Sequence, residues 1–145
     1  MKNQVNRREA LQMISCATAG ALLMPSLLAF KNNAIMKRKI PSTEEELPIV
    51  GLGTWQTFDV GNHQGLRLPL MEVLKEMKAL GGTVIDSSPM YGSSEQVVGD
   101  LCTQLKINDS FFYATKVWTN GKQAGIDQMQ ASMTKMQRQQ MDLMQ

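Results

Sequence analysis

From residue 39 onward, short apolar runs alternate along the chain with longer segments in which apolar residues recur every three or four positions. The short runs predict buried β-strands, which we expect at residues 49–52, 83–85, 111–117 and 141–144. The longer segments predict amphipathic α-helices, which we expect at residues 68–80, 94–105 and 123–140. Because predicted strands and helices alternate along the chain, the pattern is typical of βα units that build a parallel sheet.

Particular residues mark the ends and the faces of the predicted helices. Gly81 and Gly82 predict the end of the first helix, because glycine favours the turn that follows a helix. Ser93 or Ser94 is available to cap the second helix. The third helix carries an apolar stripe at helical spacing, which consists of Ile126, Met129, Met133 and Met136. Methionine fills irregular cores, so we interpret this stripe as a packing face.

The number of βα units leaves two architectures open. About three and a half units are present, and a closed (β/α)8 barrel takes about 250 residues, whereas this chain has 145. The pattern therefore fits either the N-terminal half of a (β/α)8 TIM barrel or an open four-stranded α/β sheet.

Composition and charge narrow the functional classes. With 43% apolar and 19% charged residues, the chain is typical of a folded globular protein. Its 15 Lys and Arg against 13 Asp and Glu leave a net charge of only +2, which disfavours a nucleic-acid partner. One histidine, His63, and two cysteines, Cys16 and Cys102, are too few for a metal cluster or a disulfide framework. We interpret His63 as a solvated loop residue and Cys102 as a core residue.

The first thirty residues differ from the rest of the chain. Arg7 and Arg8 precede a moderately apolar, uncharged run at residues 13–30, which is the outline of a twin-arginine export signal. We therefore expect a signal peptide at residues 1–30 and a single domain at residues 31–145. The twin-arginine export machinery would then be a partner, and the protein would work in the periplasm or elsewhere outside the cytoplasm. The alternative is an N-terminal membrane anchor, because a run of about 18 residues is just long enough to cross a bilayer.

Residues suited to chemistry follow each of the first three predicted strands. In chain order they are Gly53, Thr54 and Trp55, then Asp86 and Tyr91, then Lys116. Because the carboxyl ends of parallel barrel strands open on one face, we expect the larger of these side chains to converge. Gly51 and Gly53 begin like a dinucleotide-binding fingerprint, but no third glycine follows in place, so a Rossmann site is excluded.

Asp86, Tyr91 and Lys116 have a coherent use as a tuned general acid. A phenol has a pKa of about 10 and donates a proton poorly at neutral pH unless a nearby cation favours its phenolate. Lys116 can supply that cation, and Asp86 can keep it charged and oriented. The alternative is that Asp86 and Lys116 form a structural ion pair and that Tyr91 is an ordinary loop residue.

Three motifs, in order, resemble the aldo/keto reductase family over essentially all of residues 39–145. They are GLGTWQTF at residues 51–58, GGTVIDSSPMYGSSEQVVGDL at residues 81–101 and FFYATKVW at residues 111–118. Members of that family are (β/α)8 barrels that bind NADP(H) without a Rossmann fold and reduce small aldehydes or ketones by hydride transfer. The resemblance implies that Tyr91 is the proton donor, with Lys116 and Asp86 as its catalytic partners. It also implies a cofactor-binding set that consists of Gly53, Thr54, Trp55 and Asp86.

The family's fourth catalytic residue is a histidine that stands just past a segment resembling residues 141–145, and the 145-residue sequence ends before it. We therefore expect a partial barrel domain that is inactive by itself, with NADPH-dependent carbonyl reduction as the function of the completed protein. The alternative is a non-catalytic half-barrel that serves as a binding or interaction module.

Replacing both Arg7 and Arg8 with lysine is expected to leave the protein in the cytoplasm, because the export machinery recognises the arginine pair rather than positive charge alone. Cell fractionation measures this, with Arg38→Lys as a control that lies outside the signal. Unchanged export of the double variant through the twin-arginine route, or a mature N-terminus at Met1, would contradict the signal peptide.

Overall fold

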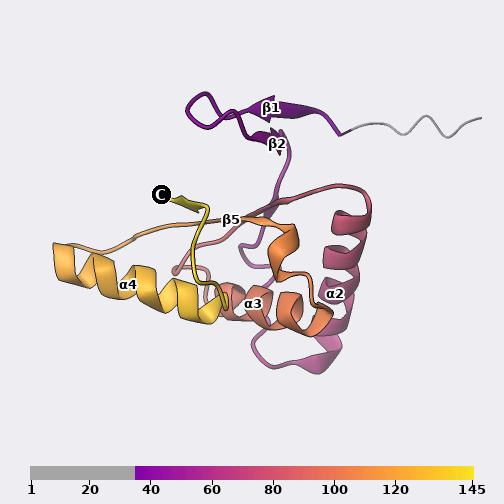
Figure 1. The fold of residues 1–145 in the computed structure, drawn as a ribbon. Coiled ribbons are helices and arrows are strands. Elements are labelled where there is room, and N and C mark those ends of the chain that lie inside the picture. The colour runs from indigo at the N-terminus through magenta and orange to yellow at the C-terminus, as the bar shows by residue number, and fades with distance from the viewer. Residues whose placement is uncertain (1–34) are drawn as a thin grey trace, which may run out of the picture. The chain divides into compact units, whose positions relative to one another are not determined.

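The computed structural model describes residues 35–145 (Figure 1), so the export segment predicted at residues 1–30 lies outside the described residues. The elements follow one another as β1 (Lys37–Lys39), β2 (Glu46–Pro48), β3 (Leu52–Gly53), α2 (Gln64–Ala79), β4 (Val84–Asp86), α3 (Ser94–Leu105), the 3-10 helix η1 (Asn108–Ser110), β5 (Phe112–Thr115), α4 (Lys122–Lys135) and β6 (Leu143–Met144).

The last four strands form one parallel sheet in the spatial order β3-β4-β5-β6. Chain order and spatial order are the same, and a helix lies between each strand and the next. A (β/α)8 barrel adds its strands in this sequential way, whereas a doubly wound sheet reverses direction at a switch point. The predicted α/β class with a parallel sheet is therefore confirmed, and the chain forms part of a (β/α)8 barrel.

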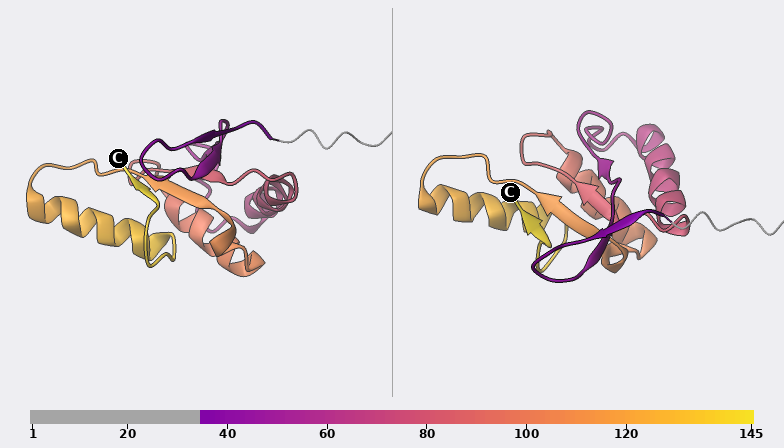
Figure 2. Two further views of the ribbon diagram at one scale, coloured as in Figure 1. Left: turned by 45° about the horizontal axis from the view of Figure 1, so that its top comes forward. Right: turned by 90° about the horizontal axis from the view of Figure 1, so that it is seen from above.

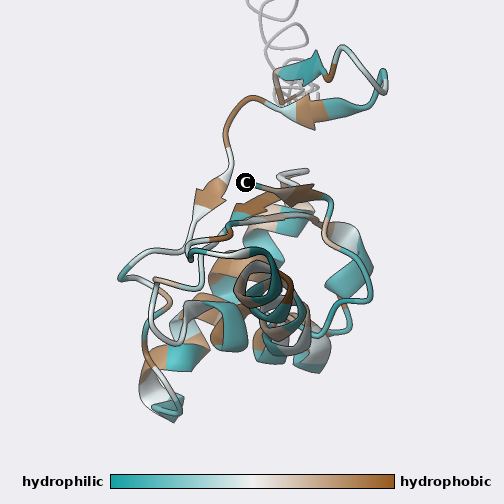
Figure 3. Ribbon diagram, turned by 90° about the vertical axis from the view of Figure 1, so that its left-hand side faces the viewer, coloured by the Kyte–Doolittle hydropathy of each residue, from teal (hydrophilic) through white to brown (hydrophobic). Residues whose placement is uncertain are grey.

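The hydrophobic core lies between the sheet and the helices, which occupy one side of the strands (Figures 1 and 2). Helix α3 is the central helix and packs against both α2 and α4. In Figure 3 the helices carry hydrophobic and hydrophilic segments in alternation, as amphipathic helices do. The buried core residues are Phe58, Leu70, Leu74, Ile85, Val97, Val98, Leu101, Cys102, Ile107, Phe111, Tyr113 and Met136.

The apolar stripe predicted on the third helix packs only in part. Met136, at the C-terminal end of α4, is fully buried, whereas Ile126 in its first half is exposed. Figure 1 shows the reason: only the C-terminal end of α4 meets α3, and the rest of α4 extends away from it. The helix also ends at Lys135 rather than at residue 140, because Gln137 takes a left-handed backbone conformation with φ 53°.

Apolar patterning misses the first hairpin and misplaces one strand. β1 and β2 pair antiparallel, from Lys37 opposite Pro48 to Lys39 opposite Glu46. β1 is charged and exposed throughout, so it offers no apolar pattern to detect. The strand predicted at residues 49–52 begins later, at Leu52, and the apolar residues before it are exposed. Helix α2 begins at Gln64 rather than at residue 68.

The expectations for the single histidine and for the described cysteine are confirmed. His63 is exposed at the residue that precedes α2. Cys102 is a free, fully buried thiol, and its burial raises its pKa, so it packs rather than reacts. Within residues 35–145, no helix is long and apolar enough to cross a membrane.

Gly99→Ala is expected to lower the free energy of unfolding by about 1–3 kcal/mol, because overpacking forces the backbone to shift. A Cβ at Gly99 of α3 would collide with the Lys135 carbonyl oxygen of α4. The matched control is Gly125→Ala, where the new Cβ meets only the Val117 side chain at an ordinary 3.5 Å. Helix propensity predicts that this control raises the stability by about 0.5–1 kcal/mol. Denaturant unfolding measures both, and equal effects would contradict a tight α3–α4 contact.

Candidate active site

The ends of β4 and β5 bring Asp86 and Lys116 together. Asp86 is the last residue of β4 and lies opposite Ala114 of β5. Side chains alternate along a strand, so Lys116, two residues beyond Ala114, is on the same face of the sheet as Asp86. The parallel register thus places a long cationic side chain within reach of the carboxylate, as the sequence predicts for these strand ends.

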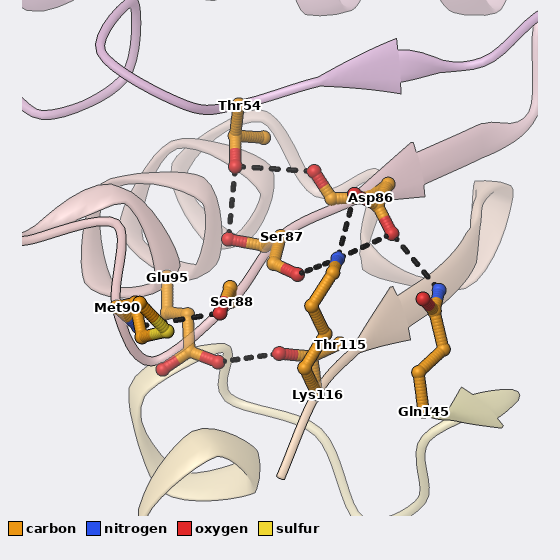
Figure 4. A network of polar contacts seen from close by, with 9 residues as sticks. All are labelled: Thr54, Asp86, Ser87, Ser88, Met90, Glu95, Thr115, Lys116 and Gln145. Carbon is orange, nitrogen blue, oxygen red and sulfur yellow. Dashed lines mark hydrogen bonds and ion pairs between the residues drawn. The ribbon is translucent and has the colours of Figure 1, made fainter. Parts of the chain in front are cut away.

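The ammonium group of Lys116 donates hydrogen bonds to three acceptors (Figure 4). Its Nζ donates to Oδ1 and Oδ2 of Asp86, at 2.9 and 2.8 Å, and to the carbonyl oxygen of Ser87, at 2.9 Å. An ammonium group has three protons, so this arrangement satisfies it completely. Both side chains of the pair are only partly exposed, at 23% for Lys116 and 37% for Asp86.

Tyr91 lies in the loop after β4, next to the ammonium group. The Nζ of Lys116 is 5.4 Å from the centroid of the Tyr91 ring, within cation–π range. Tyr91 also contacts Trp55, with ring centroids 6.3 Å apart and ring planes at 40°. The loop itself is turned by two backbone bonds, from Tyr91 to Ser88 and from Ser94 to Tyr91. The structure therefore brings Asp86, Tyr91 and Lys116 into one cluster.

A side-chain clamp ties the Tyr91 loop to the loop after β3. Asp59 accepts hydrogen bonds from the backbone N–H and the hydroxyl of Ser93, both at 2.8 Å, and these bonds hold the pKa of Asp59 below its ordinary value. Gly92 has φ 57°, and a Cβ there would collide with the Asp59 carboxylate. Ser93, expected as a helix cap, precedes α3 but makes no capping bond. Its hydroxyl oxygen accepts from the Gly61 N–H instead.

The three residues that follow the first predicted strand occupy different environments. Gly53 lies opposite Asp86 in the sheet, and a Cβ there would meet no atom within 4 Å. Thr54 is fully buried, and its hydroxyl hydrogen-bonds the Ser87 hydroxyl at 2.9 Å and the Asp86 carbonyl at 3.1 Å. Trp55 is 63% exposed. Gly53 and Trp55 therefore border open space beside the cluster, whereas Thr54 holds the end of β4 in place.

Two contacts to the cluster come from residues that sequence reasoning did not single out. Gln145, just past β6, donates from Nε2 to Oδ1 of Asp86 at 3.1 Å. Its position after a predicted strand was the signal that could have found it. The Ser87 carbonyl that accepts from Lys116 carries no such signal, because a backbone acceptor is independent of residue type.

The segment that follows Lys116 lines a pocket, and the described residues hold no cluster of metal ligands. The pocket has a volume of about 370 Å³ and is lined by residues 117–120, directly after Lys116. Trp118 in this segment is 66% exposed. Among residues 35–145, no three His, Cys, Asp or Glu side chains are grouped so that they could hold a metal ion.

Solved structures with the same fold cover most of the described residues. A crystal structure of an aldo/keto reductase from Klebsiella pneumoniae in complex with NADP and acetate matches with a TM-score of 0.59 and 28% identity, over 70% of this chain and 35% of that one. Another from Klebsiella pneumoniae, in complex with NADPH, matches with a TM-score of 0.62 and 27% identity, over 75% of this chain and 38% of that one.

Sequence comparisons lead to the same family. The methylglyoxal reductase YeaE of Escherichia coli K12 is 34% identical over 106 residues, which are 70% of this chain and 36% of that protein. The chain thus spans about a third of the length of these relatives. The model of the aldo/keto reductase family matches residues 49–145, which is more than half of the chain. With the parallel sheet and the cluster at its carboxyl edge, this match shows that the chain belongs to the aldo/keto reductase family.

Proposed function

We propose that the whole protein reduces small aldehydes or ketones with NADPH and that Tyr91 donates the proton. The observation that carries this proposal is the ammonium group of Lys116, which is held by three acceptors and lies 5.4 Å from the centre of the Tyr91 ring. A phenol becomes a useful acid at neutral pH only when a positive charge beside it favours the phenolate. This cluster provides that charge in a fixed place.

Each member of the cluster has one task in the proton transfer. Tyr91 protonates the carbonyl oxygen of the substrate as negative charge develops there. Lys116 stabilises the phenolate that remains. Asp86 orients Lys116 and balances its charge, and the Gln145 amide holds one oxygen of Asp86 in turn. Trp55 contacts Tyr91 and limits where its ring can lie.

The residues proposed to border the cofactor fit a flat, reducing nicotinamide. Gly53 has open space beside its Cα, so a ring can approach the backbone closely. Trp55 offers an exposed aromatic surface, and Thr54 and Asp86 hold the end of the neighbouring strand. When bound, NADPH supplies the hydride that reduces the carbonyl carbon. The two Klebsiella pneumoniae structures that contain NADP or NADPH support this cofactor.

A small, reactive carbonyl compound is the substrate class that we propose. The support comes from the methylglyoxal reductase of Escherichia coli, which is 34% identical to this chain over 106 residues. Three exposed side chains from the loops that carry or flank the cluster are apolar or aromatic, namely Trp55, Met90 and Trp118. Such surfaces suit the carbon skeleton of an aldehyde or ketone better than a phosphorylated or highly charged substrate.

Tyr91→Phe is expected to reduce the rate of carbonyl reduction by a factor of about 10² to 10⁴, because the ring still packs but no proton can be donated. Single-turnover oxidation of NADPH with a reactive aldehyde measures this in the whole protein. The affinity for NADPH should stay within about twofold, since a step of the chemistry is lost and not a binding contact. A Tyr91→Phe enzyme with a near-normal rate would remove the catalytic assignment.

Lys116→Met is expected to lower the rate of carbonyl reduction as well. The double variant with Tyr91→Phe should lower this rate by much less than the product of the two single-variant factors. The reason is that both residues act on one proton, so the second change removes little that the first has left. The competing ion-pair hypothesis expects a different result. On that hypothesis Lys116→Met lowers the free energy of unfolding, and Tyr91→Phe leaves the rate unchanged.

A further inference from the structure

A second carboxylate lies close to the cluster, on the helix side of the sheet. Glu95 belongs to the first turn of α3, and its side chain is only 1% exposed. Burying a carboxylate is costly unless hydrogen bonds or charges compensate it. The proposed proton transfer gives Glu95 no role, so the reason for its burial has to be found in its contacts.

The contacts of Glu95 join α3 to two other elements. Its Oε1 accepts a hydrogen bond of 2.7 Å from the hydroxyl of Thr115, the last residue of β5, which is itself fully buried (Figure 4). Its Oε2 lies 3.7 Å from Nζ of Lys135 in α4 and accepts no hydrogen bond from any described residue. The N-terminal end of α3 adds a favourable field for the negative charge.

Close packing of the two helices explains why Lys135 reaches Glu95. Gly99 of α3 leaves no room for a Cβ against the carbonyl oxygen of Lys135. Glu95 stands four residues before Gly99 and therefore lies on the same face of the helix. The approach at Gly99 thus places the Lys135 ammonium over the buried carboxylate.

The side chains of the adjacent residues Thr115 and Lys116 point to opposite faces of the sheet. Side chains alternate across a strand, so Thr115 faces the helices while Lys116 faces the Asp86 carboxylate. Glu95, in turn, comes four residues after Tyr91 along the chain. The bond between Glu95 and Thr115 therefore connects the segment that carries Tyr91 to the strand end that carries Lys116.

We propose that Glu95 is a positioning residue that, through Thr115, sets the distance between the Lys116 ammonium and the Tyr91 ring. The inference rests on the proposed function only in that Tyr91 is taken as the proton donor. Without the bond, the end of β5 keeps its ties within the sheet, which are the Lys116–Asp86 pair and the backbone bonds to the end of β4 and to β6, but it loses its tie to α3 on the helix side. Lys116 then moves relative to Tyr91 and favours the phenolate less.

Thr115→Val tests this inference, because valine keeps the shape of threonine and removes the hydroxyl. The readout is the ultraviolet titration of Tyr91, recorded as the difference between each variant and the same variant with Tyr91→Phe. Charged groups near Tyr91 are Lys116 just after β5, Asp86 from β4 and Asp59 from the loop after β3. Tyr113 cancels in the difference, and burial in any case raises its pKa far above the ordinary value.

The midpoint of the Tyr91 titration is expected to be higher in Thr115→Val than in the parent protein, because the Lys116 ammonium is no longer held at its place beside the ring. Thr115→Ser restores the hydroxyl and should restore the midpoint of the parent protein. Thr103→Val is the control for loss of stability alone. The Thr103 hydroxyl, on the surface of α3, hydrogen-bonds the side chains of Gln137 and Asn108. The midpoint of the Tyr91 titration should not change in this variant. An unchanged midpoint in Thr115→Val would overturn the inference.

If Thr115→Val does not fold, two substitutions of Glu95 test the same inference. Glu95→Gln keeps an acceptor for the Thr115 hydroxyl and should keep the parent midpoint, whereas Glu95→Met fills the space without an acceptor and should raise it. Equal midpoints in both would overturn the inference. The titration needs neither NADPH nor turnover, so its result is independent of the proposed function, which the rate of Tyr91→Phe decides separately.

Discussion

The three hydrogen bonds of the Lys116 ammonium group are the interaction on which the rest of the site depends. Two acceptors belong to the Asp86 side chain and the third is the Ser87 carbonyl, so all three come from the end of β4. They can meet Lys116 only because β4 and β5 run parallel in a register that opposes Asp86 to Ala114. A shift of one residue would turn Lys116 to the other face of the sheet. The chemistry of the site is thus tied to strand register.

Loops and helices hold the remaining parts of the cluster against this pair. The Asp59–Ser93 clamp fastens the Tyr91 loop to the loop after β3, and Gly92 permits the close approach that the clamp requires. On the other face of the sheet, Glu95 and Thr115 fasten the end of β5 to α3. Alternation of side chains along β5 separates these tasks, since it sends successive residues to opposite faces.

The family relationship and the local geometry support each other without being the same argument. The comparisons match residues 49–145 to the aldo/keto reductase family, and the match covers about a third of the relatives' own length. The geometry adds what a family match does not state: an ammonium group with every proton assigned, next to a phenol and an exposed indole. That combination is what makes Tyr91 a better candidate for a proton donor than for an ordinary loop residue.

The sequence by itself determined the order of strands and helices, the parallel sheet and the edge at which Asp86, Tyr91 and Lys116 meet, because apolar periodicity and parallel topology are properties of the local pattern. It missed β1, whose charged residues pair by backbone bonds alone, and it extended α4 beyond the turn at Gln137. Only the tertiary structure decided that the Ser87 carbonyl and the Gln145 amide join the cluster and that Glu95 is buried beside it. These contacts link residues up to 59 positions apart. Their geometry depends on register and helix packing, which no local pattern of apolar residues contains.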